Sequence, residues 1–169
     1  MALPAGWPAE QDDQRHPLEH ADDFRGALQR LIPTARRHLV IQAPALDTEL
    51  LGSTGIGTLI AQFIRQSRYC RVRVLFNDAD SALTRGHQLI TLARRFPSYI
   101  TLLQAQPDDR QRAAWLLADS RALVWRPDER YAGGYACASA PLTARGLLRD
   151  FEDHWARARP DPRLRQLYL

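Results

Sequence analysis

The chain has 169 residues, of which 45% are hydrophobic and 25% charged, a composition typical of one globular domain. All 23 of its Lys and Arg residues are arginine, which excludes chemistry that needs a lysine amine, such as a Walker A loop or a Schiff base. No segment approaches the roughly 20 apolar residues of a membrane span, and the first residues do not resemble a signal peptide. We therefore expect a cytoplasmic protein without a membrane span.

The formal net charge of +4 is unevenly distributed along the chain. Residues 1–23 carry six acidic residues and a single arginine, Arg15, so the rest of the chain has a net charge of +9. Because residues 1–21 are rich in Pro, Asp and Gln, we expect a loose acidic leader there, followed by a single domain over residues 22–169. A basic domain suits an anionic partner such as nucleic acid or a phosphate ester, although a well-hydrated surface explains the same charge.

The hydrophobic pattern predicts an alternation of helices and strands. In chain order we expect a helix that begins at Asp22 and is bent or ended by Pro33, a strand over 38–43, a helix around 56–64, a strand over 71–76, a helix with an apolar stripe from Leu83 to Phe96, and a strand over 99–103. The pattern then changes to strands over 113–118 and 121–125, joined by a hairpin turn, a further strand around 131–137, and a last helix over 141–157. This order predicts an α/β fold with a mixed β-sheet flanked by helices.

The sequence gives no reason to expect a cofactor or a metal ion. The Gly-rich segment 52–57 lacks the third glycine of a dinucleotide-binding loop, and the cysteines and histidines lack zinc-ligand spacing. Asp78 and Asp80 follow a predicted strand, where paired carboxylates can hold Mg²⁺, but a helix cap explains Asp80 more simply.

His87 lies between Leu83 and Ile90 on the apolar side of the predicted third helix. A hydrogen-bonded core histidine is the simplest interpretation. The functional alternative is a base or donor that faces a ligand, flanked by Arg85 and with Arg94 two turns further along the same side.

Two groups of arginines are candidates for anion binding. Arg65, Arg68, Arg71 and Arg73 surround Tyr69, where they either stabilise a helix C-terminus or weakly support nucleic-acid binding. A second group follows the predicted hairpin and consists of Arg126, Asp128, Arg130 and Tyr131. Its forked guanidinium donors suit a phosphate or carboxylate, and a salt-bridged loop is the alternative.

The order of elements over residues 22–157 resembles one half of the phospholipase D superfamily, as do the segments 39–44 and 72–76 and the F-x-x-x-W pattern from Phe151. This resemblance puts Asp119 at the aspartate position of the family's H-x-K-x-x-x-x-D motif. Arg112 then stands at the position of the nucleophilic histidine and Ala114 at that of the lysine. Because arginine is protonated at pH 7 and cannot attack a phosphate, the resemblance implies that the phosphodiesterase activity is lost.

The segments 85–87, 92–95 and 126–131 also resemble a proteobacterial family of phospholipase D-like domains, some of them attached to acetyltransferase domains. Our leading hypothesis is a non-catalytic domain that binds an anionic, phosphate-bearing ligand or a protein partner at the carboxyl edge of the sheet. The expected anion-facing residues are Arg85, His87, Arg94, Arg126 and Arg130, with Asp119 orienting an arginine. The alternatives are a phosphoesterase or nuclease-type enzyme that uses His87, and a homodimeric interaction module that works with an acetyltransferase.

Overall fold

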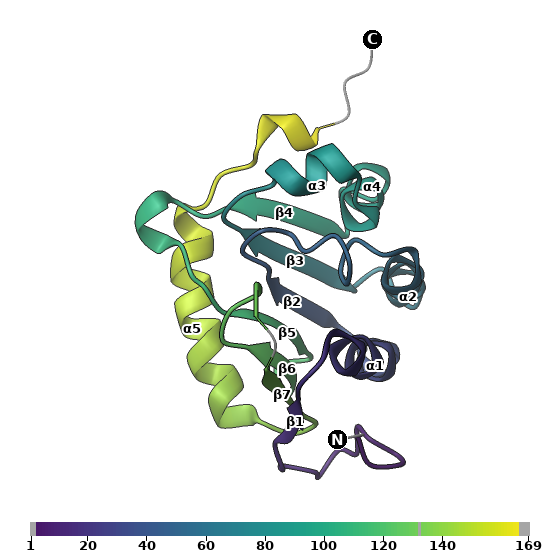
Figure 1. The fold of residues 1–169 in the computed structure, drawn as a ribbon. Helices are drawn as coiled ribbons and strands as arrows, with labels where there is room; N and C mark the ends of the chain where they lie inside the picture. Colours follow the sequence, from purple (N-terminus) through teal and green to yellow (C-terminus); the bar gives the residue numbers. More distant parts are fainter. Residues whose placement is uncertain (1–2, 132, 166–169) are drawn as a thin grey trace.

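A computed structural model describes residues 3–131 and 133–165. These residues form one seven-stranded sheet with helices on both faces (Figure 1). The strands are β1 (His16–Leu18), β2 (His38–Gln42), β3 (Arg71–Phe76), β4 (Ile100–Gln104), β5 (Ala114–Ala118), β6 (Ala122–Arg126) and β7 (Gly134–Cys137). The helices are α1 (Ala21–Leu31), α2 (Thr54–Arg65), α3 (Asp80–Arg85), α4 (Gln88–Arg95) and α5 (Pro141–Arg157).

The sheet is mixed, as the sequence predicts. Its strand order is β1-β7-β6-β5-β2-β3-β4, in which β2, β3 and β4 are parallel and the other pairs are antiparallel. Helices α1, α2 and α4 cover one face, and α5 lies alone across the other (Figure 1). Alternate strand residues supply the two cores: Leu39 and Ile41 of β2 face the first set of helices, whereas Val40 belongs to the cluster around α5.

The hairpin and the last helix form where the pattern predicts them. Asp119 and Ser120 join β5 to β6 with φ values of 52° and 59°, the two positive φ angles of a tight hairpin turn. The helix α5 begins at Pro141, a residue suited to the first helical position because its missing N–H has no partner there in any case.

Two elements differ from the sequence-based expectation. The expected third helix is broken into α3 and α4, because Gly86 adopts a positive φ of 82° and His87 is extended. In addition, part of the expected loose leader is ordered: residues His16–Leu18 pair with β7, and Trp7 and Leu18 are buried against the core. Arg30 holds this segment by donating from Nε to the carbonyl of Trp7 over 2.9 Å.

The sheet has two ends that are formed by different loops. We call the carboxyl edge the end at which β2, β3 and β4 finish and β5 begins; the last residue of β6, Arg126, also lies there, opposite Ala114. We call the amino edge the opposite end, where β2, β3 and β4 begin and the β5–β6 turn lies. In the described part of the chain, no helix combines the length and the apolar character needed to cross a bilayer.

Candidate functional site

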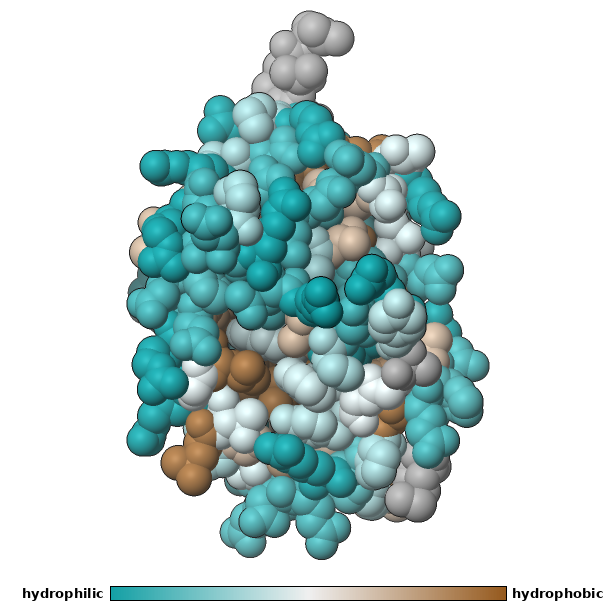
Figure 2. All heavy atoms as spheres, turned by 60° about the vertical axis from the view of Figure 1, so that its left-hand side comes forward, coloured by the Kyte–Doolittle hydropathy of each residue, from teal (hydrophilic) through white to brown (hydrophobic). Residues whose placement is uncertain are grey.

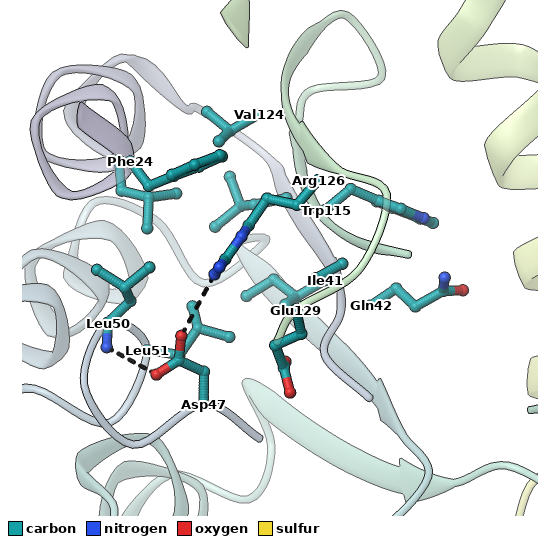
Figure 3. A pocket seen from close by; sticks show the side chains of 13 residues that line it. Phe24, Ile41, Gln42, Asp47, Leu50, Leu51, Trp115, Val124, Arg126 and Glu129 are labelled. Atoms are coloured by element: carbon teal, nitrogen blue, oxygen red, sulfur yellow. Dashed lines mark hydrogen bonds and ion pairs between the residues drawn. The ribbon is translucent and has the colours of Figure 1, made fainter. Parts of the chain in front are cut away.

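A small cavity lies at the carboxyl edge, between α1, the β2–α2 loop and the strands β5 and β6 (Figure 3). Its volume is about 40 Å³, enough for roughly three water molecules or the head of a small ligand. Most of its walls are apolar, and its lining residues are Phe24, Leu28, Ile41, Gln42, Asp47, Leu50, Leu51, Ala114, Trp115, Leu116, Val124, Arg126 and Glu129.

Arg126 supplies the positive charge of this cavity. Strand alternation places its side chain on the same face as Val124, so that the guanidinium carbon lies 4.7 Å from the ring centroid of Phe24 on α1. The Nη2 atom donates to the carbonyl of Tyr131 over 3.0 Å. The Nε atom is buried and has no hydrogen-bond partner among the described residues. A buried donor without a partner costs about 1–3 kcal/mol, so an acceptor placed at Nε would stabilise the protein.

Asp47 approaches the same guanidinium without forming a hydrogen bond to it. Its Oδ2 atom lies 3.6 Å from Nη1 of Arg126, well beyond the 2.7–2.9 Å of a charge-assisted hydrogen bond. The other oxygen, Oδ1, accepts from the backbone N–H groups of Glu49 and Leu50, at 2.7 and 3.0 Å, which fixes the carboxylate within its loop. The ion pair is therefore loose, and an anion can compete for the guanidinium.

Glu129 is the third charged residue in the cavity wall. Its Oε1 accepts a hydrogen bond of 2.8 Å from the backbone N–H of Ala45 and so connects the loop after β6 to the loop after β2. Burial raises the pKa of this carboxyl, and the nearby negative charge of Asp47 adds to the effect. A protonated Glu129 can donate a hydrogen bond to an anion, whereas an ionised one repels it.

His87 lies behind this site rather than in it. It is the N-cap residue of α4: Nδ1 accepts from the N–H of Leu89 over 3.2 Å, which leaves the proton on Nε2, and Nε2 donates to the carbonyl of Asp47 over 3.0 Å. The side chain is almost fully buried, and burial lowers its pKa. Both ring nitrogens are thus engaged with the backbone, and neither is available for proton transfer in this arrangement.

The other arginines expected at the site are not brought together with Arg126. Arg85 is exposed at the end of α3, and Arg94 donates from Nε to the carbonyl of Leu164 over 2.7 Å, which ties α4 to the C-terminal segment. Arg130 is exposed, and its Nε and Nη2 atoms donate hydrogen bonds of 3.1 and 2.8 Å to the carboxylate oxygens of Asp128. These hydrogen bonds lower the pKa of Asp128 to about 2. Arg94 and Arg130 therefore serve local contacts, and none of the three arginines lines the cavity that contains Arg126.

Asp119 lies at the opposite end of the sheet from Arg126. Its carboxylate accepts from three successive backbone N–H groups, those of Arg36, Arg37 and His38, at 2.8, 2.8 and 3.0 Å. It therefore holds the start of β2 and does not orient an arginine side chain at the carboxyl edge. Of the other two motif positions, Arg112 is exposed, and Ala114 lines the cavity.

The sequence identifies Arg126 but misses the two carboxylates that share its cavity. Asp47 and Glu129 lie in different loops, and the approach of these loops depends on the pairing of β2 with β5, which no local pattern reveals. No group of three or more His, Cys, Asp or Glu side chains within residues 3–131 and 133–165 is placed to hold a metal ion.

Solved structures similar to this chain share its fold at low sequence identity. TrmBL2, an archaeal chromatin protein with a novel mode of DNA binding, matches at a TM-score of 0.64 and 10% identity over 86% of this chain. Nuc, a phospholipase D family member from Salmonella typhimurium, matches at 0.61 and 13% over 86%. Phosphatidylserine synthase from Haemophilus influenzae Rd KW20 matches at 0.51 and 13% over 85%. These similarities show a phospholipase D-like fold.

The lengths of these proteins differ. The matched region is 95% of Nuc, 53% of TrmBL2 and 37% of the synthase, so this chain spans about half of TrmBL2 and nearly all of Nuc. No curated protein matches the chain in sequence. A family model does match, over residues 20–167, which is most of the chain, and it is described as a domain of unknown function (DUF7931). The chain therefore belongs to the DUF7931 family and has the fold of a phospholipase D-like domain.

Proposed function

We propose that this chain is a non-catalytic phospholipase D-like domain that binds a small anionic group, such as a phosphate or a carboxylate, through Arg126. The observation that carries this proposal is the buried Nε of Arg126, which has no hydrogen-bond partner among the described residues and belongs to a side chain that lines the cavity. The N–H of Nε and one N–H of Nη2 form the side-on fork of the guanidinium that binds phosphate and carboxylate oxygens in pairs, so a bidentate anion would share Nη2 with the carbonyl of Tyr131.

The position of the cavity supports the same conclusion. Ala114, which stands at the lysine position of the phospholipase D motif by resemblance, lines it. Arg112 at the histidine position is exposed and protonated, so the residues at these positions supply no nucleophile. A domain with a cavity at this position but without the nucleophile suits binding rather than hydrolysis.

The two carboxylates beside Arg126 oppose the binding of an anion. The carboxylate of Asp47 competes for the guanidinium at 3.6 Å, and an ionised Glu129 adds a second repulsive charge. An incoming anion therefore displaces the loose Asp47 contact and favours the protonated form of Glu129. Because the cavity volume is about 40 Å³, it accommodates the charged head of a ligand, while the rest of the ligand lies outside.

A thermal-shift screen with inorganic phosphate, phenyl phosphate and acetate tests the proposal. A ligand at about 100 times its Kd adds roughly 2.7 kcal/mol of stability, which is several degrees in Tm for a chain of this size. We expect Arg126→Ala to abolish the shift and Arg126→Lys, which keeps the charge but loses the fork, to weaken it. Arg145→Ala, which removes an exposed arginine of α5, is the matched control and should behave as the wild type.

The screen also distinguishes binding at Arg126 from binding at Arg130 and from catalysis. Arg130→Ala should bind as the wild type, because Arg130 is paired with Asp128 outside the cavity. An unchanged shift in Arg126→Ala would contradict the proposal. Hydrolysis of phenyl phosphate or a phosphodiester by the wild type, with or without Mg²⁺, would contradict its non-catalytic part.

A further inference from the structure

A second charged surface lies at the amino edge, away from the Arg126 cavity. The segments that meet there are residues 31–38, 65–71, 95–100 and 118–122, and they contain seven arginines but a single acidic residue, Asp119. We call this group the amino-edge surface; it consists of Arg36, Arg37, Arg65, Arg68, Arg71, Arg95 and Arg121, together with Tyr69 and Tyr99. The carboxylate of Asp119 is already engaged with backbone N–H groups.

The arginines of this surface have almost no acidic partners. Arg121 lies 3.8 Å from Glu10, and none of the other six forms an ion pair with a described residue. All except Arg121 are exposed, and neighbouring strands of a sheet lie about 4.8 Å apart, so the charges are concentrated. Arginines at or just after the ends of α2 and α4 gain from the helix dipole, but Arg37 directly precedes β2 and has no such explanation.

Aromatic rings alternate with these guanidinium groups. Tyr69 is 52% exposed, and the guanidinium carbons of Arg37 and Arg68 lie 5.3 and 4.9 Å from its ring centroid. The guanidinium carbon of Arg71 lies 5.4 Å from the ring centroid of Tyr99, a partly exposed residue in the turn just before β4. Exposed rings beside arginines provide stacking for bases and charge for a phosphate backbone, the combination found where proteins bind single strands.

A groove extends this surface. It has a volume of about 510 Å³ and shares Arg36 and Arg121 with the amino-edge surface. Its other lining residues are Pro8, Ala9, Glu10, Thr34, Asp119, Ala122 and Ala138. A chain of nucleotides that follows the strand ends from Tyr99 towards Arg121 would therefore meet a concave surface at its Arg36 and Arg121 end.

We propose that the amino-edge surface binds single-stranded nucleic acid. A double-stranded partner is less well matched, because α2 and α4 present only their C-terminal ends at this edge and do not lie along it for insertion into a major groove. An anionic membrane is also less well matched. Of the three large hydrophobic side chains that are most exposed in the described residues, Tyr69, Tyr131 and Leu142, one lies at this edge, and insertion into lipid requires an apolar face.

The side of the molecule covered by α5 provides a contrast and the control residues. Its surface is mainly hydrophilic, with small scattered hydrophobic patches (Figure 2). Arg145 and Arg149 of α5 are exposed, as is Arg110 before β5, so their replacement removes the same charge as a triple replacement at the amino edge.

Fluorescence anisotropy with a labelled oligothymidylate of about 15 nucleotides tests the proposal on the full chain. We expect binding that weakens as salt increases. The Arg37→Ala/Arg65→Ala/Arg68→Ala variant should lower affinity at least tenfold and reduce the salt slope by about 2, since each phosphate contact on a single strand contributes about 0.7. Arg37 and Arg65 make no side-chain hydrogen bond among the described residues, and a Tm measurement confirms that each variant is folded.

Four further variants make the outcome specific. Tyr69→Ala should weaken binding without changing the salt slope, whereas Tyr69→Phe should bind as the wild type because stacking is retained. The Arg110→Ala/Arg145→Ala/Arg149→Ala control should keep the wild-type affinity to within a factor of about three. Equal losses in the two triple variants, or tighter binding to duplex DNA or to vesicles containing phosphatidylserine than to the oligothymidylate, would overturn the proposal. Arg126→Ala should bind the oligothymidylate normally, which keeps this surface distinct from the cavity.

Discussion

Replacement of His87 by alanine should destabilise the protein by about 3 kcal/mol. The change removes two hydrogen bonds, from Leu89 N–H to Nδ1 and from Nε2 to the carbonyl of Asp47, each worth about 1 kcal/mol. It also leaves a void beside Gly52, at which an added Cβ would lie 2.9 Å from the His87 ring. For a chain of this length the loss corresponds to a fall in Tm of roughly 6–12 °C.

The conservative variant His87→Asn separates the two bonds. The Asn side-chain oxygen can accept from the N–H of Leu89 and restore the cap of α4, but Asn is too short to reach the carbonyl of Asp47. Thermal denaturation should therefore show a recovery of about 1 kcal/mol relative to His87→Ala. Equal stability of His87→Ala and the wild type would refute this interpretation.

The pH dependence of stability provides an independent test of His87. Burial lowers the pKa of His87 in the folded state, so the unfolded state takes up a proton at a pH where the folded state does not. The contribution of neutral His87 to the free energy of unfolding is fully present above about pH 6.5. It is lost as the pH falls towards the folded-state pKa, at up to about 1.4 kcal/mol per pH unit. Denaturant titrations between pH 7 and 5 should show this loss in the wild type but not in His87→Asn, and an identical slope in both would contradict the assignment.

Two further predictions follow from the same geometry. Asp119→Ala should destabilise the protein by about 2–4 kcal/mol in denaturant unfolding, because three backbone donors at the start of β2 lose a charged acceptor. The same variant should bind anions in the Arg126 cavity as the wild type does, and weaker binding would place Asp119 in that site. Gly52→Ala should both lower Tm and weaken anion binding. The added Cβ would lie 2.6 Å from the carbonyl oxygen of Thr48 and would displace the loop that carries Asp47. A wild-type Tm would show that the loop adapts to the larger residue.

Local patterns predicted most of the fold. The alternation in β3, the Asp119-Ser120 turn and the apolar face of α5 each carry enough information within one segment. The break between α3 and α4 was missed because the apolar stripe continues across it. The sequence feature that indicates this break is Gly86 followed directly by His87, a residue that can cap a new helix. The strand β1 was missed because its three residues have no pattern of their own and depend on β7.

The candidate site was predictable in part. Arg126 was expected at the carboxyl edge, and it lies there. Asp119 was expected beside Arg126, but the hairpin separates the two residues. Asp119 is in the β5–β6 turn, whereas Arg126 is at the open end of the hairpin, five strand residues or roughly 17 Å away. Asp47 and Glu129 could not be placed from sequence, because their loops meet through non-local strand pairing.

The unpartnered Nε–H of Arg126 can be observed directly by NMR spectroscopy. Its ¹H–¹⁵N resonance, assigned by its absence in Arg126→Lys, reports whether an acceptor reaches this atom. On titration with inorganic phosphate we expect a saturable downfield shift of this resonance, with tighter binding at lower pH as Glu129 takes up a proton, for as long as the ligand stays charged. Saturable phosphate binding that moves other resonances and leaves this one in place would show that the anion does not bind at Nε of Arg126.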